Sequence, residues 1–178
     1  MTNNYTSQIS CIASLINNFG WKKVIAVYED VGYGTTISSM LDVFSQALQE
    51  FGLEIEYRLA LPSSAFEPNP NDMITEELIK VFSMQSRVFV LLHSSLPLVV
   101  QLYKKASSMG LVGKETAWII TDNTANLLDA LNSSTKSSYM EGTLGIKTYY
   151  NEHSQEFMAF SRKFLLKFLT QYPDRYRC

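Results

Sequence analysis

The sequence contains little cysteine and little charge, and each shortage argues against a class of protein. Its two cysteines, Cys11 and Cys178, form neither a zinc motif nor a disulfide framework. Charged residues make up 18%, the net charge is −2 and no long basic run occurs, which argues against a nucleic-acid partner. No stretch reaches about 18 consecutive apolar residues, so no transmembrane helix is expected. The polar segment Met1–Ser7 lacks the features of a signal peptide.

Hydrophobic residues are plentiful, at 46% of 178 residues, which is enough for one domain with a conventional core. Segments with the apolar spacing of a helix alternate with short runs typical of buried strands. Helices are predicted near 9–19, 37–51, 72–82, 96–109 and 157–168. Strands are predicted near 23–28, 53–61, 87–92, 115–121 and 142–149, and prolines mark a loop over 62–70.

This alternation predicts an α/β fold, a doubly wound parallel sheet of about five strands in the order 2-1-3-4-5 with helices on both faces. Three finer expectations concern single side chains. Cys11 should lie in or near the core, and Phe82 should point inward from its helix. Alternate residues of the second strand should share one face of the sheet: Leu53, Ile55, Tyr57, Leu59 and Leu61.

Ligands of an open parallel sheet bind beyond the carboxyl ends of the strands. This rule selects the stretches 29–34, 93–95, 121–123 and 147–150, whose polar groups suit a small polar or zwitterionic ligand. The candidate binding residues are Asp30, Tyr33, Ser94, Ser95, Thr121 and Asp122. The helix that begins after Ser95 can hold a carboxylate at its N-terminus. Alternatively, these Asp, Ser and Thr side chains only cap the helices that follow them.

Motifs of enzymes and cofactor sites are missing. No Gly-x-Ser-x-Gly elbow offers a nucleophile for a hydrolase triad. Ile37 stands where a dinucleotide-binding loop that begins at Gly32 would need its third glycine, and no Walker lysine follows a glycine pair. His93 has no partner at metal-ligand spacing. We therefore expect a protein that is not an enzyme and that uses no cofactor and no metal ion.

Several motifs occur in the order and spacing of a known family. They are Gly20-Trp-Lys-Lys-Val24, Val27-Tyr-Glu-Asp30, Tyr33-Gly34, Met84-Gln-Ser-Arg-Val-Phe-Val90, Trp118-Ile-Ile-Thr-Asp122 and Met140-Glu-Gly-Thr-Leu-Gly-Ile-Lys-Thr-Tyr149. From about Asn4 to Phe168 the chain resembles the amino-terminal domain of plant glutamate receptor-like channels. That domain is a receptor ligand-binding region of the type I periplasmic-binding-protein class.

The resemblance implies an extracellular ligand-sensing domain of a ligand-gated cation channel, in which two lobes close around a small amino-acid-type ligand. Residues 1–178 match the second lobe of this clamshell. The first lobe, the lower ligand-binding core and the pore would lie outside the chain, which would reach the membrane only through the rest of the receptor. The expected partners are the ligand, the first lobe and other receptor subunits.

Single positions also carry over from the family. The resemblance assigns ligand contacts to Tyr33 and to Asp122, whose carboxylate would accept hydrogen bonds from the ligand's ammonium group. Tyr5 departs from the family, which often has an acidic residue just before Ser-x-Gln. Sequons at Asn4 and Asn132 suit glycosylated loops of a secreted lobe.

Two other functions remain as alternatives. The lobe could serve in receptor assembly as an oligomerisation module that binds no ligand. A phosphoacceptor receiver has the same strand order, and Glu29-Asp30, Thr121 and Lys147 fit its site. The third strand ends in His93, however, where a receiver requires its acceptor aspartate.

Overall fold

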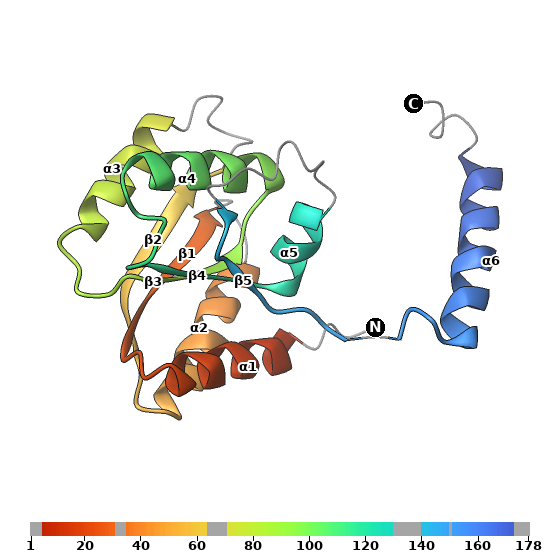
Figure 1. Cartoon of the computed structure of the whole chain (residues 1–178), viewed down its shortest axis with the longest axis horizontal. Helices are drawn as coiled ribbons and strands as arrows, with labels where there is room; N and C mark the ends of the chain where they lie inside the picture. Colours follow the sequence, from red (N-terminus) through yellow and green to blue (C-terminus); the bar gives the residue numbers. More distant parts are fainter. Residues whose placement is uncertain (1–4, 31–34, 64–70, 130–139, 150, 173–178) are drawn as a thin grey trace. The chain divides into compact units, whose positions relative to one another are not determined.

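The computed structural model describes residues 5–30, 35–63, 71–129, 140–149 and 151–172. The helices are α1 (Tyr5–Asn18), α2 (Thr35–Gln49), α3 (Asn71–Val81), α4 (Leu96–Ser108), α5 (Asp122–Asp129) and α6 (Gln155–Gln171). The strands are β1 (Lys23–Asp30), β2 (Glu54–Pro62), β3 (Val88–His93), β4 (Ala117–Ile120) and β5 (Leu144–Gly145). The strands form one parallel sheet in the order β2-β1-β3-β4-β5 (Figure 1), which confirms the predicted α/β fold and its strand order.

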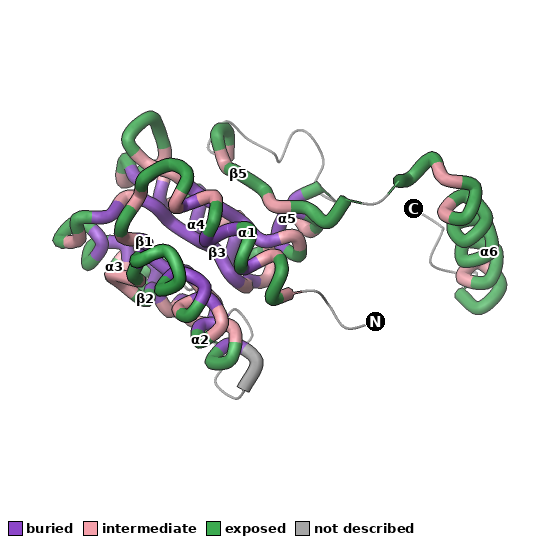
Figure 2. The backbone as a smooth tube through the Cα atoms, turned by 90° about the horizontal axis from the view of Figure 1, so that it is seen from below, coloured by how far each residue is buried: buried purple, intermediate pink, exposed green. Residues whose placement is uncertain are grey.

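Helices cover both faces of this sheet, α1 and α2 on one face and α3, α4 and α5 on the other (Figure 1). Strand β3 contributes to both sides: Phe89 and Leu91 pack with α3, α4 and α5, and Val88, Val90 and Leu92 pack with α1 and α2. Figure 2 shows the resulting buried centre. A strand covered on both faces needs apolar residues at every position, which explains the uninterrupted run that the sequence shows here.

Two glycines end helices at the predicted places. Gly20 follows α1 with φ +72° and Gly52 follows α2 with φ +67°, a left-handed conformation that glycine adopts without a steric cost. The N–H of Trp21 donates to the carbonyl of Ile16 at 3.2 Å and closes the end of α1. A short turn therefore leads from α1 into β1 and from α2 into β2. The two strands are parallel, and their carboxyl ends lie at the same edge of the sheet.

The expectation that alternate residues of the second strand share one face is wrong. They divide between the faces, with Leu53 and Ile55 on the side of α1 and α2 and Tyr57, Leu59 and Leu61 on the side of α3, α4 and α5. The cause is one extra residue, Glu56, because Val24 pairs with Ile55 while the next residue, Ile25, pairs with Tyr57. Such a bulge moves every later side chain to the opposite face.

Three smaller expectations also need correction. Cys11 is exposed rather than in the core, because the side of α1 that faces the core is formed by other residues, such as Ile9 and Ile12. Phe82 is 49% exposed, since α3 ends at Val81 and the helical spacing no longer directs the next side chain inward. The strand predicted over 142–149 is only the two residues Leu144–Gly145, which pair with the end of the short strand β4.

Residues 1–147 and 148–178 form two separate compact units. The sheet belongs to the first unit, and α6 belongs to the second. The phenylalanine stripe predicted for this last helix is present, with the rings of Phe160 and Phe164 stacked at 6.0 Å and those of Phe164 and Phe168 at 6.1 Å. No residue of α6 is buried. The described candidate binding residues all belong to the first unit.

Candidate functional site

A pocket of about 570 Å³ lies at the carboxyl ends of β3 and β4, at the sheet edge that the topology rule selects. Its walls come from α1, α2, the ends of the two strands and the start of α5, and its lining residues are Tyr5, Gln8, Ser39, Met40, Leu92, His93, Thr121, Asp122, Asn123 and Asn126. This volume lies within the range of about 300–1,000 Å³ that is usual for small-molecule sites.

Asp122 supplies the acidic group of this pocket, at the first position of α5. Its carboxylate accepts a hydrogen bond from Gln8 Nε2 at 3.3 Å and another from Asn126 Nδ2 at 2.9 Å. Asn126 lies one turn further along α5, whereas Gln8 comes from α1. Both amides are neutral donors that orient the carboxylate. The geometry allows Asp122 to receive a cationic group of a ligand.

Thr121 also lines the pocket, but its side chain forms its hydrogen bond with the neighbouring strand. The buried hydroxyl donates to the carbonyl oxygen of Leu92 at 3.1 Å and lies 3.5 Å from Thr124 Oγ1. These contacts tie the end of β4 to the end of β3 and to α5. Thr121 therefore holds the strand ends in register beneath Asp122.

Ser94 and Ser95 bind a carboxylate that belongs to the protein itself. Glu29, at the end of β1, is only 3% exposed. Its carboxylate accepts hydrogen bonds from Ser95 N–H at 2.6 Å, Ser94 Oγ at 3.4 Å and Ser63 Oγ at 3.1 Å. The N-terminus of α4 favours this anion, as expected for a helix start. Neither Ser94 nor Ser95 is among the residues that line the Asp122 pocket.

The remaining predicted residues lie elsewhere. Asp30 is exposed and lines a different pocket of about 340 Å³ beside Glu76 and Glu77, so the structure does not bring it together with Asp122. Tyr33 and the sequon residues Asn4 and Asn132 lie outside the described residues.

Two residues of α1 line the pocket although neither is among the predicted binding residues, and the sequence singled out Tyr5 only as a departure from the family pattern. Tyr5 and Gln8 are three residues apart, which places them on the same side of the helix. The hydroxyl of Tyr5 is buried and has no hydrogen-bond partner within the described part of the chain, and burial raises the pKa of this phenol, which stays protonated. The Asp122–Asn126 contact was visible as a spacing of four residues. The contact with Gln8 spans 114 residues and left no local signal.

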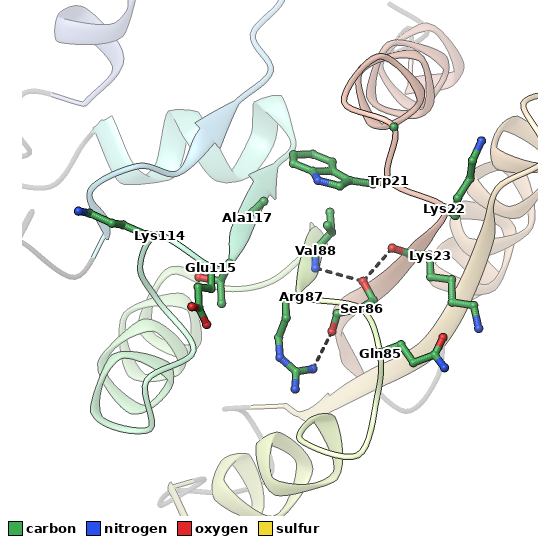
Figure 3. Close-up of a pocket in the computed structure, with 12 residues that line it drawn as sticks. Trp21, Lys22, Lys23, Gln85, Ser86, Arg87, Val88, Lys114, Glu115 and Ala117 are labelled. Carbon is green, nitrogen blue, oxygen red and sulfur yellow. Dashed lines mark hydrogen bonds between the residues drawn. The ribbon is translucent and has the colours of Figure 1, made fainter.

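A second pocket, of about 510 Å³, lies at the opposite edge, in front of β1, β3 and β4 (Figure 3). Polar groups here hold the fold together: Ser86 Oγ donates to the carbonyl of Lys23 at 2.7 Å and accepts the N–H of Val88 at 3.1 Å. Arg87 Nη1 donates to the carbonyl of Met84 at 2.8 Å. In Figure 3 the three lysines of the rim point away from one another. We therefore place the candidate site at the carboxyl edge.

The described part of the chain offers neither a metal site nor a membrane-spanning helix. No group of three or more His, Cys, Asp or Glu side chains is arranged to hold a metal ion there. Likewise, none of the described helices has both the length and the apolar character that crossing a bilayer requires.

Comparison with known proteins gave consistent matches. The family model of the receptor family ligand binding region matches residues 1–174. Glutamate receptor 2.6 of Arabidopsis thaliana is 29% identical over 177 residues, which are 99% of this chain and 17% of that protein. Glutamate receptor 2.1 of the same plant is 32% identical over 163 residues, 92% of this chain and 17% of the relative. Glutamate receptor 2.2 of this plant is 35% identical over 144 residues, which are 81% of this chain and 15% of that protein. The chain thus spans less than a fifth of each relative.

Proposed function

The chain belongs to the receptor family ligand binding region, and from this premise we propose that it is the second lobe of an extracellular ligand-sensing domain in a plant glutamate receptor-like cation channel. In this proposal the lobe binds a small amino-acid-type ligand and closes on it together with a first lobe outside this chain. Other receptor subunits are further partners, and the rest of the receptor holds the lobe at the membrane. The family is one of receptor domains, and we propose no catalytic role.

The observation that carries the proposal is the Asp122 carboxylate in the pocket at the carboxyl edge. An α-ammonium group that meets it would form a charge-assisted hydrogen bond, worth roughly 1.5–3 kcal/mol. The pocket has the size of a small-molecule site, and amides and hydroxyls surround the carboxylate. Because one lobe supplies only part of the contacts, we expect weak binding, with a Kd on the order of 1 mM.

The test replaces Asp122 by asparagine, which keeps the shape of the side chain and removes its negative charge. The 178-residue chain is titrated with glycine, L-alanine, L-glutamine and L-glutamate while the NMR amide signals of residues 121–126 are followed. We expect Asp122→Asn to weaken binding by about 10- to 150-fold. The matched control is Asp129→Asn, at an exposed position of the same helix outside the pocket lining, and it should bind like the wild type.

Two results would contradict the proposal. One is equal affinity of the wild type and Asp122→Asn, and the other is no signal change with any of the four amino acids. A lower melting temperature of Asp122→Asn with unchanged affinity would show that Asp122 contributes to stability only.

The assembly module remains the second candidate, because one observation favours it. Phe160 and Phe164 on α6 are 61% and 59% exposed, and a large exposed apolar surface is typical of an interaction site. The receiver alternative has less support. Strand β3 ends in His93 rather than in an aspartate, and Lys147 is engaged in an ion pair with Asp129.

A further inference from the structure

The charge of the Asp122 pocket is one-sided. Among the described residues that line it, Asp122 is the only carboxylate and there is no lysine or arginine. The other polar lining groups are the amides of Gln8, Asn123 and Asn126, the hydroxyls of Tyr5, Ser39 and Thr121, and the imidazole of His93. This lining provides for one cationic group and for several neutral groups that donate or accept hydrogen bonds.

Tyr5 does not change this balance. Its ring packs against the core on the side of α1 and α2, and its hydroxyl is buried. Burial raises the pKa of Tyr5, so that the phenol remains neutral. The negative charge of the lining therefore comes from Asp122 alone.

A ligand's side chain meets this lining after its ammonium group has paired with Asp122. The α-carboxylate is common to both members of an amide–acid pair, so it cancels in their comparison. A side-chain carboxylate would in addition lose water, would find no Lys or Arg among the described lining residues, and would lie near the negative charge of Asp122. Both effects disfavour an anion. A carboxamide of the same shape can donate to and accept from the neighbouring amides, since it carries both kinds of group.

We propose that this pocket selects amino acids with a neutral polar side chain, such as glutamine, over their acidic counterparts, such as glutamate. The inference rests on the proposed function, because it assumes that an amino acid binds at Asp122. It is drawn from the lining of this pocket and not from the names of the relatives, which are called glutamate receptors.

The experiment compares ligand pairs that differ almost only in charge. L-glutamine is compared with L-glutamate, and L-asparagine with L-aspartate, by NMR titration of the 178-residue chain. All four ligands are titrated in the same buffer at the same pH, so that only the ligand differs within a pair. We expect each amide to bind about tenfold more tightly than its acid, the effect of one like charge nearby.

A variant with an added cation tests the cause. Asn123 is an exposed residue of the lining, so Asn123→Lys should fold and place an ammonium group at the pocket. We expect this change to raise glutamate affinity relative to glutamine by about tenfold. The control is Ser108→Lys, which adds the same charge at the exposed end of α4 in front of β4, at the opposite edge. It should leave the ratio of the two affinities unchanged.

Each outcome separates the two claims. Glutamate binding as tightly as glutamine to the wild type would overturn the inference and leave the proposed function standing. No binding of glycine or of any other amino acid tested would overturn both. An equal change of the ratio in Asn123→Lys and Ser108→Lys would show that the net charge of the protein sets the preference, and this too would overturn the inference.

Discussion

Two glutamates show how single carboxylates organise this lobe. Glu29 joins the end of β1 to the start of α4 through hydrogen bonds from Ser94 and Ser95, and to the residue after β2 through one from Ser63. At the other edge, Glu56 is the extra residue of the β2 bulge, and its carboxylate accepts the N–H groups of Gln85 at 3.0 Å and Ser86 at 2.7 Å. Each carboxylate thus accepts backbone N–H groups from the segment that leads into another element. Glu29 binds the segment before α4, and Glu56 binds the segment before β3.

The Glu56 contacts predict a pH dependence of stability. Burial works against the charged form, but the hydrogen bonds from Ser86 and Gln85 and the charges of Lys23 and Arg87 outweigh it, and the pKa of Glu56 is lowered. A lowered folded-state pKa adds stability above the unfolded value of about 4.3, and this stability is lost as the pH falls through the folded pKa.

We therefore expect Glu56→Gln to lower the free energy of unfolding by about 1 kcal/mol at neutral pH, and the difference from the wild type to shrink in acid. Urea unfolding over a range of pH measures this. The control is Glu54→Gln, whose side chain is 65% exposed and whose effect should stay within about 0.5 kcal/mol. A difference that does not change with pH would show that the charge of Glu56 is unimportant.

At the scale of the element, α6 differs from the other helices. Within the second unit, α6 has no buried residue and carries stacked phenylalanines along one side. Ser154 caps it by accepting the N–H of Phe157 at 3.1 Å. The helix thus has a proper start and an aromatic side that is open to an interaction partner.

This aromatic side predicts self-association of the chain at high concentration. The double change Phe160→Ser and Phe164→Ser should shift the protein toward the monomer, because it removes two large exposed rings. Lys163→Ser, at another exposed position of the helix, is the control and should change association little. Sedimentation velocity measures the effect. A wild type that stays monomeric at every concentration would refute the prediction.

At the scale of the whole molecule, the hydrophobic core lies entirely within the first unit. All buried hydrophobic residues of the described chain fall between Ile9 and Leu128. Beyond this stretch, only β5 adds to the sheet of this unit, where Leu144 and Gly145 pair with β4. Folding of the lobe should therefore depend little on the residues of the second unit.

Truncation tests this division. We expect residues 1–147 alone to fold and to melt within a few degrees of the full chain, because no buried residue is removed. Residues 1–139, which lack β5, should melt at a lower temperature, since the edge of β4 loses its partner. Circular dichroism melts compare the three chains. An unfolded 1–147 fragment would show that the second unit is required for folding.

The sequence by itself determined the fold class, the strand order and the sheet edge that carries the pocket. These properties follow from apolar periodicity, glycine helix stops and the handedness of crossovers, which are local or nearly local. It also placed Asp122 at the end of its strand, and it identified the start of α4 as a place for a carboxylate, without finding that Glu29 fills it.

Only the tertiary structure decided the face of each residue in β2, the separation of Asp30 from Asp122, and the contact of Gln8 with Asp122. A bulge depends on which backbone groups the neighbouring segment offers, and Glu56 meets Gln85 and Ser86 only after folding. The Gln8 contact likewise joins residues 114 positions apart. Periodicity records the environment of a side chain along its own element, but it does not record which distant residue will lie opposite.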